Sequence, residues 1–274
     1  MTPAEIGERR DEIVARRGPW RADNLRLAKG IFTIGEGAAG SEARVRCTVQ
    51  AVADIASRRL PGLRVLELAC GEGGLALEFG KQGAEVVAIE ARAALAEKAE
   101  FAREALGLHQ VTILRGDPGR PSPEVHGYFD VVLALGVLDR LDAPEVLDVA
   151  TRLGAVCKGF ALIEARLAAR ARSTRQSRGI VLRGAPRSRD GVSSFLLTRA
   201  SMLSLLARSG FTSIVETLRP EADSAAPCFA AFKGRRVALQ TAPQANAVLP
   251  PSWDGGEPAT PKSGIAGLLR RERR

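Results

Sequence analysis

The 274-residue sequence contains few aromatic, cysteine and histidine residues. Aromatic side chains make up 4% of the chain, and there are four cysteines and two histidines. The cysteines are far apart and form no Cys-x-x-Cys pair, so His109 and His126 complete no zinc ligand set. We therefore expect no metal site, and we expect reduced thiols with a structural role.

Long apolar runs are also absent. No run of about 18 apolar residues exists, so the sequence predicts no membrane-spanning helix and no membrane partner. Residues 1–20 carry charge throughout and lack the apolar stretch of a signal peptide. These two absences predict a cytoplasmic location. The length predicts one substantial domain with appendages.

Short apolar runs alternate with helical patterns in the middle of the chain. Helical spacing predicts two N-terminal helices, within 1–18 and 41–59. Strands are then expected at 64–68, 85–90, 111–114, 129–135 and 160–164, and helices at 73–81, 93–106 and 143–153. Strands and helices that alternate at this spacing indicate a parallel, doubly wound α/β sheet.

The end of the chain follows another pattern. A helix at 198–209 precedes two predicted strands, 213–218 and 228–233, which only a loop connects. Such a loop permits antiparallel pairing, so we expect a Rossmann-like, mostly parallel sheet of seven strands whose last strand is antiparallel. Residues 240–274 are rich in Pro, Ala and Gly and predict a disordered tail. Residues 61–239 would then form the main domain.

A glycine-rich turn follows the first predicted strand. Gly71 and Gly73 would let the backbone approach a ligand closely, and Glu90 ends the next strand, where a carboxylate can hold ribose hydroxyls. This pattern indicates a nucleoside site. The spacing Gly71-x-Gly73-x-x-Ala76 also fits a dinucleotide fingerprint. Three features favour S-adenosylmethionine (SAM) instead. They are the acid Glu67 before the turn, the acid Asp117 after the third strand, and the two strands that end the domain.

Residues 65–141 resemble the class I, Rossmann-like SAM-dependent methyltransferases of bacteria. Residues 67–73 match the first motif of that family, Glu90 the second, Asp117 the third and 129–141 the fourth. The resemblance implies SAM as cofactor and the following cofactor-binding residues: Glu67, Ala69, Gly71, Gly73, Glu90, Ala91, Asp117 and Leu135. Ala69 departs from the family by replacing the first glycine of its commonest pattern.

Three shorter segments, 18–24, 136–141 and 194–199, resemble a group of bacterial methyltransferases. This likeness implies that residues 1–60 form a helical lid over the pocket. Where relatives often have Leu-Tyr-His-Leu, this chain has Leu138-Asp139-Arg140-Leu141. The Tyr and His are absent, so a contact of these two side chains with substrate is not expected here.

Methyl transfer from a sulfonium requires an aligned nucleophile more than a base. Positioning alone can contribute about 7–11 kcal/mol, so a general base is optional. Asp139 follows the fourth predicted strand and Glu164 ends the fifth, at the edge of the sheet where ligands bind. These two acids are the candidate catalytic residues.

Residues 166–197 form a predicted arginine-rich cap. Eight arginines and no acid lie between Arg166 and Arg189, in a chain of net charge +9. The segment fits a solvated loop, a cap for an anionic small molecule, or an RNA-binding cap. Because the stretch has no aromatic residue for base stacking, RNA is the less favoured partner.

The sequence therefore favours a SAM-dependent methyltransferase that acts on oxygen or nitrogen of a small molecule. An RNA (tRNA) methyltransferase is the first alternative. The second is a SAM-binding regulatory or scaffold domain without catalysis.

Overall fold

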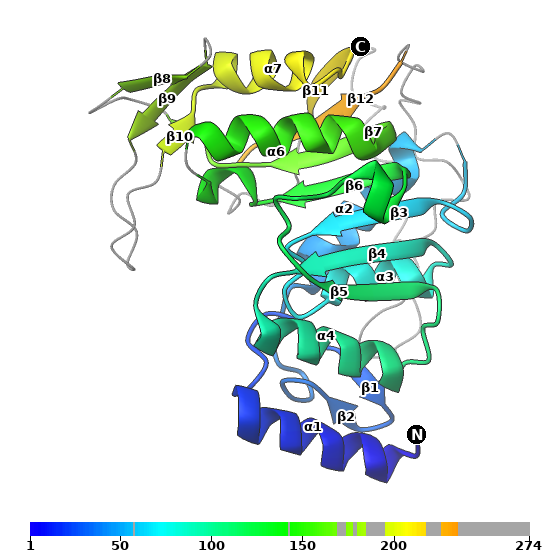
Figure 1. Cartoon of the computed structure of the whole chain (residues 1–274). Helices are drawn as coiled ribbons and strands as arrows, with labels where there is room; N and C mark the ends of the chain where they lie inside the picture. Colours follow the sequence, from blue (N-terminus) through cyan, green and yellow to red (C-terminus); the bar gives the residue numbers. More distant parts are fainter. Residues whose placement is uncertain are drawn as a thin grey trace, which may run out of the picture.

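The computed structural model describes residues 1–56, 58–141, 143–168, 174–177, 180–184, 195–217 and 226–234. Its centre is a seven-stranded sheet in the order β11-β12-β7-β6-β3-β4-β5 (Figure 1). The parallel strands are β3 (Arg64–Leu68), β4 (Glu85–Glu90), β5 (Val111–Arg115), β6 (Phe129–Leu135) and β7 (Cys157–Glu164). The chain leaves β3 toward β4 and β5 and then returns to β6 on the other side. This reversal opens a crevice at the carboxyl ends of β3 and β6.

The two last strands close the sheet as the sequence predicts. β12 (Cys228–Phe232) pairs antiparallel with both β7 and β11 (Ser213–Thr217). The predicted Rossmann-like sheet of seven strands with an antiparallel last strand is thereby confirmed. The predicted tail, residues 240–274, lies outside the described residues.

Helices cover both faces of the sheet. α2 (Glu42–Ile55), α3 (Gly74–Lys81) and α4 (Ala93–Ala105) lie on one face, and α6 (Ala143–Val156) and α7 (Arg199–Arg208) lie on the other (Figure 1). Successive strand residues point to opposite faces, so Val65 and Val86 join the first core while Leu66 and Val87 join the second. A short helix, α5 (Pro123–His126), precedes β6, and a 3-10 turn, η1 (Leu138–Arg140), follows it.

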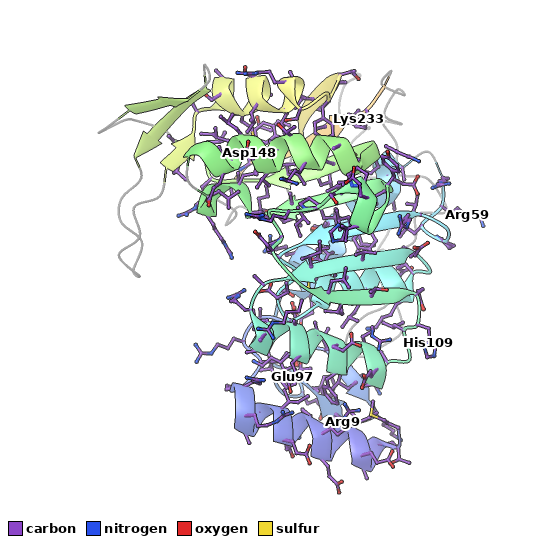
Figure 2. All side chains as sticks on the ribbon, viewed as in Figure 1. Arg9, Arg59, Glu97, His109, Asp148 and Lys233 are labelled. Carbon is purple, nitrogen blue, oxygen red and sulfur yellow. The ribbon has the colours of Figure 1, made fainter. Side chains whose placement is uncertain are left out.

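The N-terminal helix α1 (Pro3–Arg17) packs beside α4. Thr2 and Glu5 form a capping box at its start, and Ile6 and Ile13 are buried on its inner face. Ion pairs join the two helices: Arg9 with Glu104 at 3.0 Å, and Arg16 and Arg17 with Glu97 at 2.7 and 2.6 Å. Figure 2 labels Arg9 on α1 and Glu97 on the neighbouring α4. These pairs are partly exposed and contribute little, so the buried isoleucines hold α1 in place.

Two small sheets were not predicted. β1 (Arg26–Ala28) and β2 (Ile31–Phe32) form a hairpin, and β8 (Thr174–Ser177), β9 (Ile180–Gly184) and β10 (Phe195–Leu197) form an antiparallel sheet in the order β10-β9-β8. The second sheet lies within the predicted cap. β10 contacts η1, which follows the carboxyl end of β6, and β8 contacts α6. Part of the cap therefore stands beside the end of the sheet where ligands bind.

No helix in these described ranges has the length and apolarity that a membrane crossing requires.

Candidate cofactor site

The turn between β3 and α3 consists of residues 69–73. Gly71 and Gly73 adopt φ angles of +64° and +92°, a region that favours glycine. A Cβ on Gly73 would lie 2.8 Å from the Cβ of Ala99, so the close approach of α4 also requires glycine there. A Cβ on Gly71 would meet no atom within 4 Å. Open space therefore lies above Gly71, at the point where the sequence places a cofactor.

Glu90, the last residue of β4, is 2% exposed and faces this turn. Its Oε2 accepts a hydrogen bond of 2.9 Å from the backbone N–H of Gly71, and its Oε1 accepts bonds of 3.0 Å from the backbone N–H and from Nε of Arg92. A carboxylate offers about four acceptor positions. The exposed Arg92 side chain can move away, which would leave capacity for two ribose hydroxyls.

Glu67 lies within β3 and is 8% exposed. Burial, followed by the nearby charge of Asp23, raises the pKa of Glu67 to about 8, against the opposing effect of Arg44. Its Oε2 has no hydrogen-bond partner among the described residues. A buried carboxyl oxygen without a partner is costly, which makes it a candidate ligand contact.

The other predicted cofactor residues are more exposed. Asp117 follows β5, where its Oδ1 accepts from the N–H of Gly119 at 2.8 Å and its Oδ2 pairs with Arg120 at 3.2 Å. Ala91 is exposed beside Glu90, and Leu135 is half-buried at the end of β6. The sheet thus brings the ends of β3, β4, β5 and β6 to one edge, while the role of each residue stays a prediction.

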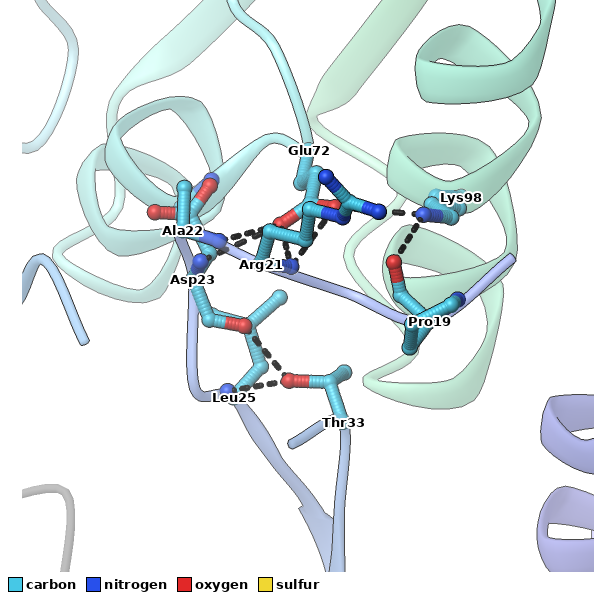
Figure 3. Close-up of polar contacts among 9 residues, drawn as sticks. Pro19, Arg21, Ala22, Asp23, Leu25, Thr33, Glu72 and Lys98 are labelled. Atoms are coloured by element: carbon cyan, nitrogen blue, oxygen red, sulfur yellow. Dashed lines mark hydrogen bonds and ion pairs between the residues drawn. The ribbon is translucent and has the colours of Figure 1, made fainter. Parts of the chain in front are cut away.

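Residues 18–25, which we call the strap, lie against the glycine-rich turn (Figure 3). Glu72, the residue between the two glycines, is 4% exposed and accepts from the N–H groups of Arg21, Ala22 and Asp23 at 2.9 to 3.2 Å. The ammonium of Lys98, on α4, lies 3.2 Å from Glu72 and donates to the carbonyl of Pro19 at 2.7 Å (Figure 3). One buried ion pair therefore fastens the strap to both the turn and α4.

Asp23 extends from the strap to the start of α3. Its Oδ2 accepts from the N–H of Gly74 at 2.8 Å, and its Oδ1 accepts from the hydroxyl of Ser41. The first turn of a helix has N–H groups without an intrahelical partner, so Asp23 caps α3 from a distant segment. Burial raises the pKa of Asp23, although both hydrogen bonds lower it.

Trp20 belongs to the strap but does not line the open space. It is 2% exposed, its ring centroid lies 6.1 Å from that of Phe101, and Lys98 lies over the ring at 5.2 Å. The side chain fills the junction with α4. Its contribution is therefore packing, and the lid role of residues 1–60 stays a prediction.

The structure describes the side chain of only one of the two candidate catalytic acids. The backbone of Asp139 lies in η1, but its side chain is outside the described part of the chain. The side chain of Glu164, at the end of β7, is 12% exposed, and its Oε1 lies 3.3 Å from the guanidinium of Arg44 on α2.

Glu72, Lys98 and the role of Asp23 were not predicted from the sequence. Glu72 occupies the variable position of Gly71-x-Gly73, and Lys98 lies within a helix rich in alanine. A lysine that is 3% exposed needs a counter-charge, yet the sequence does not show which side of α4 is covered.

These residues fit SAM. The turn leaves space for a ligand above Gly71, Glu90 has acceptor capacity for the ribose, and the orphaned oxygen of Glu67 can accept from a cationic group. Among the described residues, no group of three or more His, Cys, Asp or Glu is arranged to hold a metal ion.

Comparisons with known proteins agree with this geometry. Residues 65–159 match the family described as "Methyltransferase domain". A protein-L-isoaspartate O-methyltransferase of Gloeobacter violaceus is 35% identical over 89 residues, which cover 32% of this chain and 43% of that protein. The chain thus spans less than half the length of this curated relative. These findings support a class I SAM-dependent methyltransferase, a class whose cofactor is SAM.

Solved structures share the fold over most of the chain. The N-terminal domain of EvdMO1, crystallised in the presence of S-adenosylhomocysteine (SAH) and D-fucose, has a TM-score of 0.68 at 20% identity and covers 86% of this chain and 98% of that one. The magnesium protoporphyrin IX methyltransferase of Synechocystis with bound SAM has a TM-score of 0.53 at 19% identity and covers 73% and 87%. At these identities the likeness concerns the fold.

Proposed function

We propose that this protein transfers the methyl group of SAM to an oxygen or nitrogen atom of a small molecule. The observation that carries the proposal is the glycine-rich turn, where open space lies at the Cβ position of Gly71 and the buried Glu90 accepts from the N–H of the same glycine. When bound, SAM supplies an electrophilic methyl group on a sulfonium. The protein's own residues would hold that group and exclude water from it.

The arrangement of the turn and the strand ends supports the proposed cofactor contacts. Glu90 would accept from the ribose hydroxyls once the Arg92 side chain moves aside, and Asp117 would face the adenine. The backbone of residues 69–73 would lie along the methionine part. The strap would limit access of water from the side of α4, because Glu72 and Lys98 hold it against the turn.

Glu164 is the described acid best placed to accept a proton. It ends β7 at the carboxyl edge of the sheet, where its Oε1 lies 3.3 Å from the guanidinium of Arg44. A hydroxyl acceptor loses its proton as the oxygen gains the methyl group, whereas an ammonium acceptor must lose a proton first, so that its nitrogen has a lone pair to attack the methyl group. Glu164 or water would take that proton. Asp139 is the second candidate, on the turn after β6. Positioning supplies most of the acceleration if neither acts.

The small-molecule acceptor is supported by two features. Structures with the same fold are described with D-fucose or as a porphyrin methyltransferase. The cap beside η1 also offers arginines for an anionic group, in the segment 166–189.

The substrate class can be tested by transfer of radiolabelled methyl from SAM to a panel of deoxysugars, porphyrins, an isoaspartyl peptide and total tRNA. We expect label in a small molecule. Label in tRNA would replace this proposal by the RNA methyltransferase. SAM binding without transfer to any member of this panel would favour a regulatory domain.

The cofactor assignment predicts the effect of Glu90→Ala. Loss of hydrogen bonds to a charged carboxylate costs about 1.5–3 kcal/mol, so the affinity for SAM should fall about 10–100-fold. Isothermal titration calorimetry measures this change. Glu85→Ala, at the exposed start of the same strand, is the matched control and should bind SAM normally. Equal affinities of wild type and Glu90→Ala would contradict the assignment.

A further inference from the structure

Two large apolar side chains are exposed at the amino edge of the sheet, opposite the glycine-rich turn. Val125 on α5 is 76% exposed, and Tyr128, which immediately precedes β6, is 47% exposed. The ammonium of Lys158, near the start of β7, lies over the Tyr128 ring at 4.3 Å from its centroid. We call Val125, Tyr128 and Lys158 the amino-edge patch. Single exposed apolar side chains are ordinary, whereas neighbouring ones beside a cation form a candidate contact surface.

Lys158 differs from the other cations at this edge because no acid within the described ranges pairs with it. Nearby, Arg64 pairs with Glu85 at 2.8 Å, and Arg58 pairs with Asp130. The positive charge of Lys158 is therefore available to an acid from another part of the chain or from a partner. An occupant that fits the patch would carry an aromatic or apolar group next to a carboxylate.

The described chain ends beside this patch. β12 runs antiparallel to β7, so its last residues lie at the amino edge, where the N–H of Lys233 donates to the carbonyl of Gly159 at 2.7 Å. Figure 2 labels Lys233 on the same side of the sheet as Arg59, which precedes β3. The spacing of strands and the rise per residue place Gly234 about 10–15 Å from Tyr128.

The sequence that continues from this point contains a matching segment. Within 237–261 the charged residues are Asp254 and Glu257 alone, and both are negative. Trp253 immediately precedes Asp254. The segment 248–257 therefore combines an aromatic side chain with an adjacent carboxylate, which is the chemistry that the patch would bind.

The length of the connection favours a contact within one chain. The residues 235–252 separate Gly234 from Trp253. Even a glycine-rich chain of that length spans about 21–25 Å on average, which exceeds the distance to Tyr128. A tethered segment that reaches its site has an effective concentration on the order of 1 mM, so a contact with a dissociation constant of about 1 mM is half occupied. Weak contacts therefore suffice.

We propose that residues 248–257 of the same chain dock on the amino-edge patch. Trp253 packs against Val125 and the exposed part of the Tyr128 ring, and the carboxylate of Asp254 pairs with the ammonium of Lys158. The patch lies at the edge of the sheet opposite the proposed cofactor site, so the inference does not depend on the proposed function.

Fluorine NMR of the full chain labelled with 5-fluorotryptophan tests this contact. The chain has two tryptophans, Trp20 and Trp253, and Trp253→Phe assigns their signals. We expect the Trp253 signal of the wild type to differ in chemical shift from the signal of an isolated peptide of residues 246–258. A Trp253 signal at the peptide position would overturn the proposal.

Substitutions in the patch should release Trp253. Tyr128→Ser should move the Trp253 signal to the peptide position because the aromatic contact is lost, whereas Tyr128→Phe keeps the ring and the docked position. Leu203→Ser, at a 38% exposed position of α7, is the matched control and should leave the signal unchanged. Val125→Ser repeats the test at a more exposed position if Tyr128→Ser alters the circular dichroism spectrum. Folded variants of Tyr128 and Val125 that do not move the signal would refute docking on this patch.

Charge and protein concentration separate this occupant from others. Lys158→Gln should weaken docking about 1.5–5-fold, the contribution of one partly exposed ion pair, as read from the population-weighted shift of the Trp253 signal. An unchanged equilibrium in Lys158→Gln would refute the pairing with Asp254. If the docked fraction rises with protein concentration, the segment docks on a second copy of the chain and the contact within one chain is wrong.

Discussion

At the residue scale, Ala69 adopts a backbone conformation that glycine adopts at lower cost. Its φ of 57° is the one positive value of a non-glycine residue in the described ranges. The left-handed region costs alanine about 1–2 kcal/mol, and glycine would lose about 0.4–1 kcal/mol through the entropy of the unfolded chain. The structure thus explains why the family pattern has glycine at this position and why alanine is tolerated.

This balance predicts that Ala69→Gly leaves the free energy of unfolding unchanged or raises it by up to about 1 kcal/mol. Urea unfolding measures the effect, and SAM affinity should stay within about 2-fold. Ala88→Gly is the matched control, because Ala88 is fully buried in β4 and glycine weakens a strand interior. If Ala69→Gly were as destabilising as Ala88→Gly, the strain at Ala69 would be absent.

At the element scale, the buried pair of Glu72 and Lys98 joins three segments that lie far apart in the sequence. Its side chains are 5% and 3% exposed, and Glu72 also holds three N–H groups of the strap. Removal of one partner from a buried ion pair leaves an uncompensated charge and costs about 3–5 kcal/mol. The strap therefore depends on both residues.

A double-mutant cycle tests this dependence. Glu72→Gln and Lys98→Met should each lower the free energy of unfolding by about 2–4 kcal/mol, since some hydrogen bonds remain, and the double variant should lose less than their sum. The more exposed pair Glu100 and Arg103 on the same helix is the control, with at most about 1 kcal/mol of coupling. Simple additivity at Glu72 and Lys98 would show that they act independently.

The elements themselves were largely predictable. Runs such as Phe129–Leu135 carry the apolar pattern of a buried strand, and the structure places β6 at those residues. The loop between β11 and β12 left antiparallel pairing as the natural choice, and the structure confirms it. Strands of two or three residues, such as Ile31–Phe32, are too short for a periodic signal, so the hairpin of β1 and β2 was missed. The second small sheet was missed because Thr174–Ser177 is polar throughout and has no alternating apolar pattern.

The sequence predicted only the part of the site whose residues lie in one turn or at the ends of adjacent strands. Gly71 and Gly73 lie in one turn, and the parallel sheet brings Glu90 to them because adjacent strands end at the same edge. The contact of Asp23 with Gly74 joins residues 51 positions apart, through a strap without regular pattern. No spacing rule connects such residues, so only the folded chain reveals this part of the site.

At the scale of the whole molecule, the net charge of +9 is concentrated in one segment. Residues 166–189 carry eight arginines, and the small sheet within the cap contacts η1 and α6 near the carboxyl edge of the sheet. Eight positive charges in one segment suit either one anionic group of a small acceptor or a row of phosphates. The two cases differ in how many counterions binding releases.

Salt dependence distinguishes them. If all eight arginines neutralised RNA phosphates, the logarithm of the affinity would fall with the logarithm of salt concentration at a slope of about −6 to −7. We expect instead weak RNA binding with a shallow slope, because no aromatic side chain in 166–189 offers a base a surface to stack on. Filter binding of total RNA at several salt concentrations measures this slope. Replacement of the eight arginines by glutamine would leave methyl transfer intact only if the segment is a solvated loop. Submicromolar RNA binding with a slope steeper than about −4 would make RNA the acceptor that this cap serves.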